Sequence, residues 1–166
     1  MRQQKILFVC TGNICRSPTA EGVARALAAR LGVAHLFLFD SAGTQGFHAG
    51  EPPDARAVKA AVQRGYDLSG LRARQVVEKD FAQFDYVLAM DQGHLQSLAK
   101  RCPPTAKDRL GLFLDYAQAS AVAEPALAGG VPDPYYGGPE GFEYVLDVVE
   151  ATTQRLIRHL LERAVD

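Results

Sequence analysis

The sequence has little of what marks a secreted, membrane-spanning or nucleic-acid-binding protein. It has no tryptophan and three cysteines, and an odd, small number of cysteines does not form a disulfide framework. No run approaches the 18 apolar residues of a membrane span, and the five residues Ile6–Cys10 are too few for a signal peptide. The net charge of −1 excludes partners held by bulk electrostatics. We therefore expect a reduced, cytoplasmic enzyme or binding protein.

The histidines and cysteines also lack the spacing that is typical of metal ligands. The four histidines, His35, His48, His94 and His159, are not spaced with the cysteines as zinc ligands are. We therefore expect no metal and no cofactor.

The length of 166 residues predicts one domain spanning residues 1–166, and 48% hydrophobic residues suffice for a core. Short apolar runs alternate with helical patterns. The expected strands are Ile6–Cys10, Leu36–Phe39, Tyr86–Met90 and, more weakly, Leu110–Leu114. The expected helices run from Pro18 to about Leu31, from Asp54 to Arg64, briefly after Asp91, and from about Pro139 to the C-terminus. This alternation predicts an α/β fold, with a parallel sheet covered by helices on both faces.

The first expected helix has clear boundary signals. Ser17 is a plausible N-cap, Pro18 suits the first helical position, and Gly32 offers a stop. A similar stop is expected at Gly65. The long segment from Asp115 to about Pro139 is expected to be a loop, and a loop of that length is usually functional or disordered.

The segment between the first strand and this helix carries the strongest chemical signal. It reads Cys10-Thr11-Gly12-Asn13-Ile14-Cys15-Arg16-Ser17. Backbone N–H groups of such a turn can converge on a phosphate at a helix N-terminus, and Arg16 adds a fork suited to an oxyanion. The same positive surroundings would keep Cys10 as a reactive thiolate. The alternative is that Cys10 is a small buried strand residue and Arg16 a surface charge.

A second candidate lies far along the chain, at Asp133-Pro134-Tyr135-Tyr136. An aspartate held over a cleft could act as a general acid and then as a base. Residues alone favour the simpler interpretation that Asp133-Pro134 is a turn.

Together these motifs resemble the low-molecular-weight protein tyrosine phosphatases. The similar residues are Val9 to Pro18 with Ala20-Glu21; Ser41 to Thr44 with His48, Gly50, Pro53, Asp54 and Arg56-Ala57; Arg72 to Gln75; Asp85 to Asp91; and Asp133 to Tyr135. The resemblance implies a four-stranded parallel sheet in the order 2-1-3-4, with a phosphate-binding loop after the first strand. It also implies hydrolysis of phosphotyrosine and other aryl phosphate monoesters through a cysteinyl-phosphate, without metal, with Cys10 as nucleophile, Arg16 binding phosphate and Asp133 as general acid.

The same resemblance assigns the other expected site residues. Thr11, Gly12, Asn13, Ile14, Cys15 and Ser17 would form the phosphate loop, with Phe47, Tyr135 and Tyr136 as walls. Within the loop, the resemblance implies that Ser17 donates its hydroxyl to the Cys10 thiolate and that Asn13 holds the loop conformation. Core packing is an equal alternative for Phe47 and Tyr136. It further implies a reversible Cys10–Cys15 disulfide under oxidation. Asp91 would cap the next helix or brace the loop, and we rank the cap first.

Two other functions remain open. A thioredoxin-coupled arsenate reductase would need two further cysteines, whereas Cys102 alone lies outside the loop. A non-catalytic phosphotyrosine-binding module would be expected to lack Cys10 or Asp133. We expect a phosphotyrosine protein as partner, possibly a bacterial tyrosine kinase, and a monomer capable of transient dimers.

Overall fold

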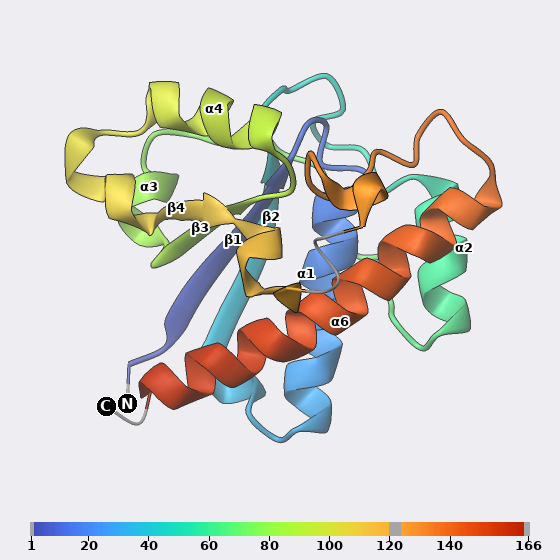
Figure 1. Ribbon diagram of the computed structural model, residues 1–166, viewed down its shortest axis with the longest axis horizontal. Coiled ribbons are helices and arrows are strands. Elements are labelled where there is room, and N and C mark those ends of the chain that lie inside the picture. Colours follow the sequence, from blue (N-terminus) through green and yellow to red (C-terminus); the bar gives the residue numbers. More distant parts are fainter. Residues whose placement is uncertain (1, 120–123, 165–166) are drawn as a thin grey trace.

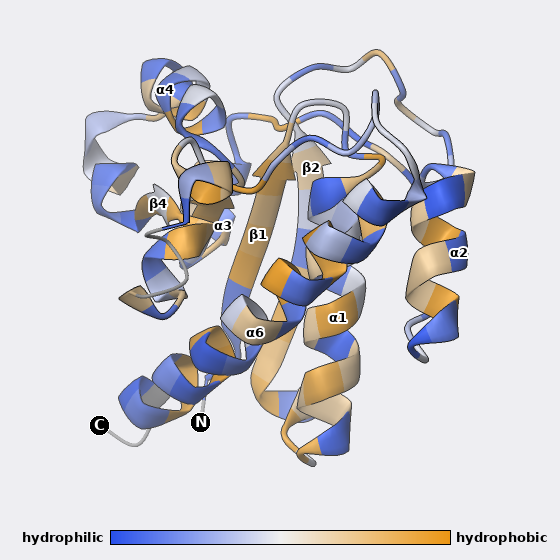
Figure 2. Cartoon of the chain, turned by 45° about the vertical axis from the view of Figure 1, so that its right-hand side comes forward, coloured by the Kyte–Doolittle hydropathy of each residue, from blue (hydrophilic) through white to orange (hydrophobic). Residues whose placement is uncertain are grey.

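Four parallel strands form the centre of the computed structural model, which describes residues 2–119 and 124–164. The strands are β1 (Gln4–Cys10), β2 (Phe37–Gly43), β3 (Tyr86–Ala89) and β4 (Leu110–Leu112), in the order β2-β1-β3-β4. β1 pairs with β2 on one side and with β3 on the other. This central position explains the apolar run Ile6–Cys10 within β1, which Figure 2 shows in orange. The predicted fold and strand order are confirmed.

Helices cover both faces of the sheet (Figure 1). They are α1 (Arg16–Arg30), α2 (Ala55–Gln63), α3 (Asp80–Gln83), α4 (Gln92–Arg101) and α6 (Pro139–Ala164). Short 3₁₀ turns occupy Ala34–Leu36 (η1), Pro104–Arg109 (η2), Phe113–Tyr116 (η3) and Pro125–Leu127 (η4). No helix of the described residues is long and apolar enough to cross a membrane.

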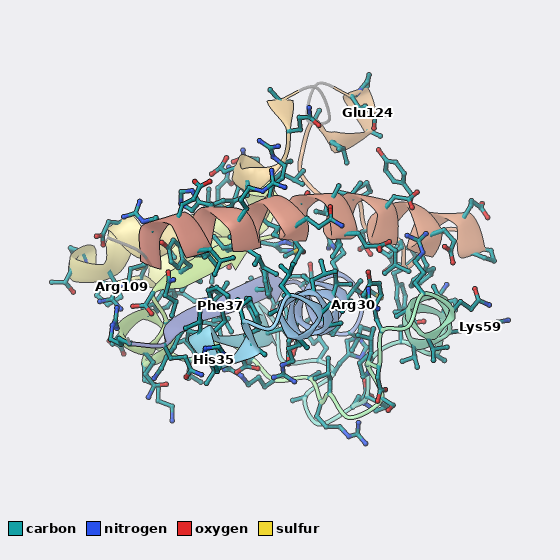
Figure 3. All side chains as sticks on the ribbon, turned by 90° about the horizontal axis from the view of Figure 1, so that it is seen from below. Arg30, His35, Phe37, Lys59, Arg109 and Glu124 are labelled. Atoms are coloured by element: carbon teal, nitrogen blue, oxygen red, sulfur yellow. The ribbon has the colours of Figure 1, made fainter. Side chains whose placement is uncertain are left out.

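Alternate side chains of β1 pack into two separate hydrophobic cores, one on each face of the sheet. Ile6 and Phe8 pack on the side of α1, α2 and α6, whereas Leu7 and Val9 pack on the side of α3 and α4. All four are fully buried, as the period of two along a strand between two helical layers requires. Figure 3 shows the side chains filling the space beneath α6, with Lys59 and Glu124 at the periphery.

Several element boundaries differ from the expected ones. β4 ends at Leu112 rather than Leu114, because Phe113 begins a 3₁₀ turn that the Asp115 carboxylate closes onto the Leu112 N–H at 3.2 Å. β2 begins at Phe37 rather than Leu36 and continues to Gly43. The expected stops are confirmed: Gly32 and Gly65 have φ of 73° and 86°. Within the expected loop Asp115–Pro139, η3 and η4 are ordered turns, and residues 120–123 lie outside the described residues.

The prediction that Ser17 caps α1 is wrong. The helix begins at Arg16, its N-cap is Cys15, and no side chain caps it. Ser17 lies inside the first turn, fully buried, with its hydroxyl 3.0 Å from the Cys10 sulfur. Pro18 is therefore the third helical residue, still within the turn that tolerates a missing N–H. By contrast, Asp91 caps α4 as expected, since its carboxylate accepts the His94 N–H at 2.8 Å.

Candidate active site

The candidate site lies at the carboxyl end of β1, where the loop to α1 begins. The chain leaves β1 toward β2 on one side and later returns to β3 on the other, so this is the switch point where open α/β sheets bind ligands. The cleft there has a volume of about 260 Å³. Ten predicted site residues and His48 line it, namely Cys10, Thr11, Gly12, Ile14, Cys15, Arg16, Phe47, His48, Asp133, Tyr135 and Tyr136.

Asn13 fixes the conformation of the loop from beneath. It has a φ of 59°, the left-handed region that asparagine tolerates better than most residues. Its side-chain N–H groups donate to the hydroxyls of Ser17 and Ser41 at 2.8 and 2.9 Å, and its oxygen accepts the Arg74 backbone N–H at 3.0 Å. Asn13 is therefore both the turn residue expected from the sequence and a buried brace for the loop.

Hydrogen-bond donors surround the sulfur of Cys10. Cys10 is 3% exposed and lies at the N-terminal end of α1, whose free N–H groups attract negative charge. Since the Ser17 oxygen accepts from Asn13, the Ser17 hydroxyl hydrogen is available to donate to the sulfur 3.0 Å away. The first turn of α1 thus brings Ser17 to Cys10, as the resemblance implies.

Arg16 is buried and held by fixed partners. Its guanidinium is 3.0 Å from the Asp91 carboxylate and donates to the Val131 carbonyl, also at 3.0 Å. It is 4% exposed, so it is not the surface charge of the alternative interpretation. Asp91 therefore performs both roles considered for it, capping α4 and orienting Arg16.

Asp133 lies across the cleft from Cys10, in the segment between η4 and α6. One carboxylate oxygen is 3.8 Å from the Arg16 guanidinium, and the other accepts the Tyr135 N–H at 3.1 Å. The preceding residues are anchored, because the Val131 N–H donates to the Met90 carbonyl at 2.8 Å. The carboxylate is about half exposed, which leaves it accessible to a ligand in the cleft.

His94 lies between Thr11 of the phosphate loop and Asp91, the carboxylate that orients Arg16. The sequence did not indicate this position for His94. It is buried, and its Nε2 lies 2.7 Å from the Thr11 hydroxyl, while Nδ1 is 3.1 Å from the Asp91 carboxylate. Burial, followed by the nearby Arg16, lowers the pKa of His94 from 6.5 to about 4. The ring is therefore neutral at pH 7. Its position three residues after a helix-capping aspartate is the one signal that could have suggested it.

Aromatic side chains stand at the rim of the cleft. Phe47 and Tyr136 are 79% and 91% exposed, so they are not core residues. Tyr135 packs edge-on against Tyr136, with ring centroids 4.9 Å apart. His48, which the sequence did not single out for the site, lies against Gly12, where a Cβ would come within 2.8 Å of its ring, and is paired with Glu51 at 2.6 Å.

Cys15 is a buried thiol beside Cys10. Burial, with smaller contributions from Asp54 and Cys10, raises its pKa to about 12, so it stays protonated at neutral pH. All three cysteines are free thiols in the structure. Among the residues described, no group of three histidine, cysteine or acidic side chains is arranged to hold a metal ion.

Comparisons with known proteins agree with this geometry. A family model described as low molecular weight phosphotyrosine protein phosphatase matches residues 5–165. The chain is 44% identical to a Streptomyces coelicolor low molecular weight protein-tyrosine-phosphatase, over 96% of this chain and 94% of that protein. It is 37% identical to the human low molecular weight phosphotyrosine protein phosphatase, over 97% and 96%.

Solved structures give the same result. The crystal structure of an Entamoeba histolytica protein tyrosine phosphatase superposes with a TM-score of 0.90 at 38% identity, covering 98% of this chain and 99% of that one. Bacillus subtilis YfkJ superposes with a TM-score of 0.89 at 35% identity, covering 98% of each chain. From its cleft, its fold and these similarities, the chain belongs to the low molecular weight phosphotyrosine protein phosphatase family.

Proposed function

We propose that this protein hydrolyses phosphotyrosine and other aryl phosphate monoesters through a cysteinyl-phosphate on Cys10. The observation that carries the proposal is the placing of three groups around one cleft. The Cys10 sulfur lies 3.0 Å from the Ser17 hydroxyl, and Cys10, the buried Arg16 and Asp133 line the same cleft, with the Asp133 carboxylate 3.8 Å from the Arg16 guanidinium. These are the groups that phosphoryl transfer to a thiolate needs.

In the first step, the Cys10 thiolate attacks phosphorus and the bond from phosphorus to the aryl oxygen breaks. Protonated Asp133 gives its proton to the departing oxygen, so that the alcohol leaves neutral. Arg16 and the backbone N–H groups of the loop bind the three phosphoryl oxygens. Because Asp91 and the Val131 carbonyl already orient Arg16, little reorganisation is needed as charge develops.

In the second step, water attacks the phosphorus of the cysteinyl-phosphate. The Asp133 carboxylate, now ionised, accepts a proton from the water, the sulfur–phosphorus bond breaks, and inorganic phosphate leaves. The Ser17 hydroxyl donates to the returning thiolate and makes it a better leaving group.

The rim supports an aromatic substrate. Phe47, Tyr135 and Tyr136 offer exposed ring surface above the phosphate loop, and Ile14 adds an apolar contact within it. We propose phosphotyrosyl proteins as substrates, a tyrosine kinase among them, and a monomer that can associate transiently. A nucleophilic thiol also requires a reducing compartment, for which the cytoplasm is our proposal.

The arsenate reductase alternative gains no support. Cys102, the one cysteine outside the loop, is buried at the end of α4, and its thiol donates to the Pro103 carbonyl at 3.4 Å. A disulfide relay would need that thiol near Cys10 and a further partner.

The proposal is tested with 4-nitrophenyl phosphate and phenyl phosphate, in the presence of a chelator. Cys10→Ser should abolish turnover, whereas Cys102→Ser should keep it. Asp133→Ala should lower kcat/KM by about 10- to 10³-fold, and more for phenyl phosphate, whose leaving group needs the proton more. Asp108→Ala, an exposed aspartate away from the cleft, is the matched control. Turnover by Cys10→Ser, or equal slowing of both substrates by Asp133→Ala, would contradict the assigned roles.

A further inference from the structure

The N-terminus of α2 is attached directly to the phosphate loop. Asp54, its N-cap, donates its backbone N–H to the Ile14 carbonyl at 2.8 Å. Ile14 lies in the middle of the loop that surrounds Cys10. Any group fixed to the first turn of α2 is therefore fixed relative to the phosphate site.

Arg56 is the group fixed in this way. The Asp54 carboxylate accepts the Arg56 backbone N–H at 2.8 Å and two guanidinium N–H groups at 3.0 and 2.9 Å. A two-point contact of this kind sets the plane of the guanidinium as well as its position. The hydrogen bonds from Arg56, followed by its charge, lower the pKa of Asp54 below the ordinary value, so the Asp54 carboxylate stays ionised at neutral pH.

The guanidinium of Arg56 reaches the segment that carries Asp133. Its central carbon lies 5.3 Å from the centre of the Tyr135 ring and 4.7 Å from that of Phe142 on α6, both within the range of cation–π attraction. Tyr135 is two residues beyond Asp133, and its N–H donates to the Asp133 carboxylate at 3.1 Å. Figure 1 shows the segment before α6 passing beside α2.

Asp133 is thus held from both sides along the chain. Two residues before it, Val131 is fixed by the Met90 backbone and by Arg16. Two residues after it, Tyr135 lies beneath Arg56. The Asp133 carboxylate itself is 3.8 Å from Arg16, too far for a hydrogen bond to that side chain, so its placement depends on these two flanking attachments.

We infer that Arg56 is a positioning residue that sets the Asp133 carboxylate at the distance from the phosphate loop needed for proton transfer to the leaving group. The inference rests on the proposed function, because it assigns Arg56 to the acid step. It also explains why one arginine contacts Asp54 and Tyr135 at once: it connects the segment beside the nucleophile to the segment beside the acid.

Two substitutions separate the parts of this contact. Arg56→Met keeps an apolar side chain beside the Tyr135 and Phe142 rings. It removes the guanidinium, and with it the charge and the two-point contact with Asp54. Arg56→Lys keeps a cation near the rings but cannot make the two-point contact with Asp54. If Arg56 acts by positioning, lysine should restore part of the activity that methionine loses.

The experiment measures kcat/KM for phenyl phosphate and 4-nitrophenyl phosphate in wild type, Arg56→Met, Asp133→Ala and the double variant. Arg56→Met should lower kcat/KM about tenfold for phenyl phosphate, a misplacement effect smaller than the ~10² expected for a shift of 1 Å, and clearly less for 4-nitrophenyl phosphate. In the Asp133→Ala background, Arg56→Met should have no further effect, because the acid that it positions is gone.

Arg64→Met is the matched control. Arg64 also ties α2 to α6, through Glu143 and Asp147, but does not contact Tyr135. Arg64→Met should lower the free energy of unfolding and leave the ratio of kcat/KM between the two substrates unchanged. Two outcomes would overturn the inference while leaving the proposed function intact. In one, the losses of kcat/KM caused by Arg56→Met and Asp133→Ala are fully additive in the double variant. In the other, Arg64→Met changes the ratio of kcat/KM between the two substrates as much as Arg56→Met does. Wild-type rates in Asp133→Ala would instead remove the acid assignment, and this inference with it.

Discussion

At the scale of single residues, the chemistry depends on buried polar groups that satisfy one another. The Asn13 amide donates hydrogen bonds to the hydroxyls of Ser17 and Ser41. The Ser41 hydroxyl in turn donates a hydrogen bond to the buried Glu21 carboxylate at 2.6 Å. The Ser17 hydroxyl, which accepts from Asn13, can therefore donate to the Cys10 sulfur at 3.0 Å or to the Ala42 carbonyl at 3.5 Å, and the sulfur is the nearer acceptor. A buried network of this kind holds a single geometry because an unmade hydrogen bond in it is costly.

His94 makes stability depend on pH. Its pKa is lowered from 6.5 to about 4 by burial and Arg16, which outweigh the opposing charges of Asp91 and Asp133. Between these values the unfolded chain takes up a proton that the folded protein does not, so stability falls as pH drops from about 6.5 to about 4. If His94 titrated completely over this shift, the free energy of unfolding would change by about 3 kcal/mol.

Urea denaturation of wild type and His94→Asn between pH 7 and pH 5 checks this prediction. Wild type should lose more of its free energy of unfolding than the variant over this range. Glu21, whose pKa burial raises, acts in the opposite direction in both proteins, so the difference between them isolates the imidazole. Parallel pH profiles for the two proteins would show that His94 is not the group responsible.

At the scale of elements, the end of β2 supports the phosphate loop from the side. Gly43 is paired with Cys10 across the two strands, and the following Thr44 N–H donates to the Cys10 carbonyl at 2.9 Å. A Cβ on Gly43 would come within 2.6 Å of the Thr11 carbonyl oxygen and 2.9 Å of the Gln45 carbonyl oxygen. Both are backbone atoms, which cannot move aside as a side chain can.

Gly43→Ala should therefore push the loop away from β2. We expect a loss of about 1–3 kcal/mol in the free energy of unfolding, as for overpacking, and a fall in kcat/KM of up to about 10²-fold. Gly70→Ala is the control, because a Cβ there would meet nothing within 4 Å. The measurements are urea denaturation and 4-nitrophenyl phosphate kinetics, and a fully active Gly43→Ala would rule out this role for the strand end.

At the scale of the whole molecule, stability and catalysis occupy different regions. Leu156 is fully buried in the core beneath α6, about 25 Å along the helix from Pro139 and the cleft. The site, in contrast, is built at the carboxyl ends of the strands. Core substitutions far from that edge should change how much protein is folded more than how the folded protein reacts.

Leu156→Ala tests this separation. Removing its side chain should destabilise the protein by about 2–5 kcal/mol, whereas Leu31→Ala, at a position 62% exposed, should change stability by less than about 0.5 kcal/mol. The kcat/KM of folded Leu156→Ala should stay close to wild type. Circular dichroism during urea denaturation, with kinetics in the absence of urea, measures both; a large loss of kcat/KM in the folded variant would argue against the separation.

The local signals in the sequence were sufficient for much of the fold. The apolar run of β1, the glycines that end α1 and α2, and the periodicity of α6 each act within a few residues, so they predicted the elements and their alternation. β4 and η3 were harder, because Leu110–Leu114 is a short apolar run whose turn at Phe113 depends on the Asp115 side chain. That residues 1–166 form one domain stays a prediction.

By itself, the sequence determined which residues are candidates for the chemistry: Cys10 and Arg16 lie within a single loop at the end of one buried strand, and their spacing and types suffice to suggest a phosphate site. Only the tertiary structure decided what surrounds them. It removed the helix-cap role of Ser17 and left its contact with the Cys10 sulfur, and it placed His94 against Thr11 and Arg56 beside Tyr135. The contacts of His94 with Thr11 and of Arg56 with Tyr135 join segments far apart along the chain, 83 residues in the first case, and no local pattern encodes which distant side chains a folded sheet brings together.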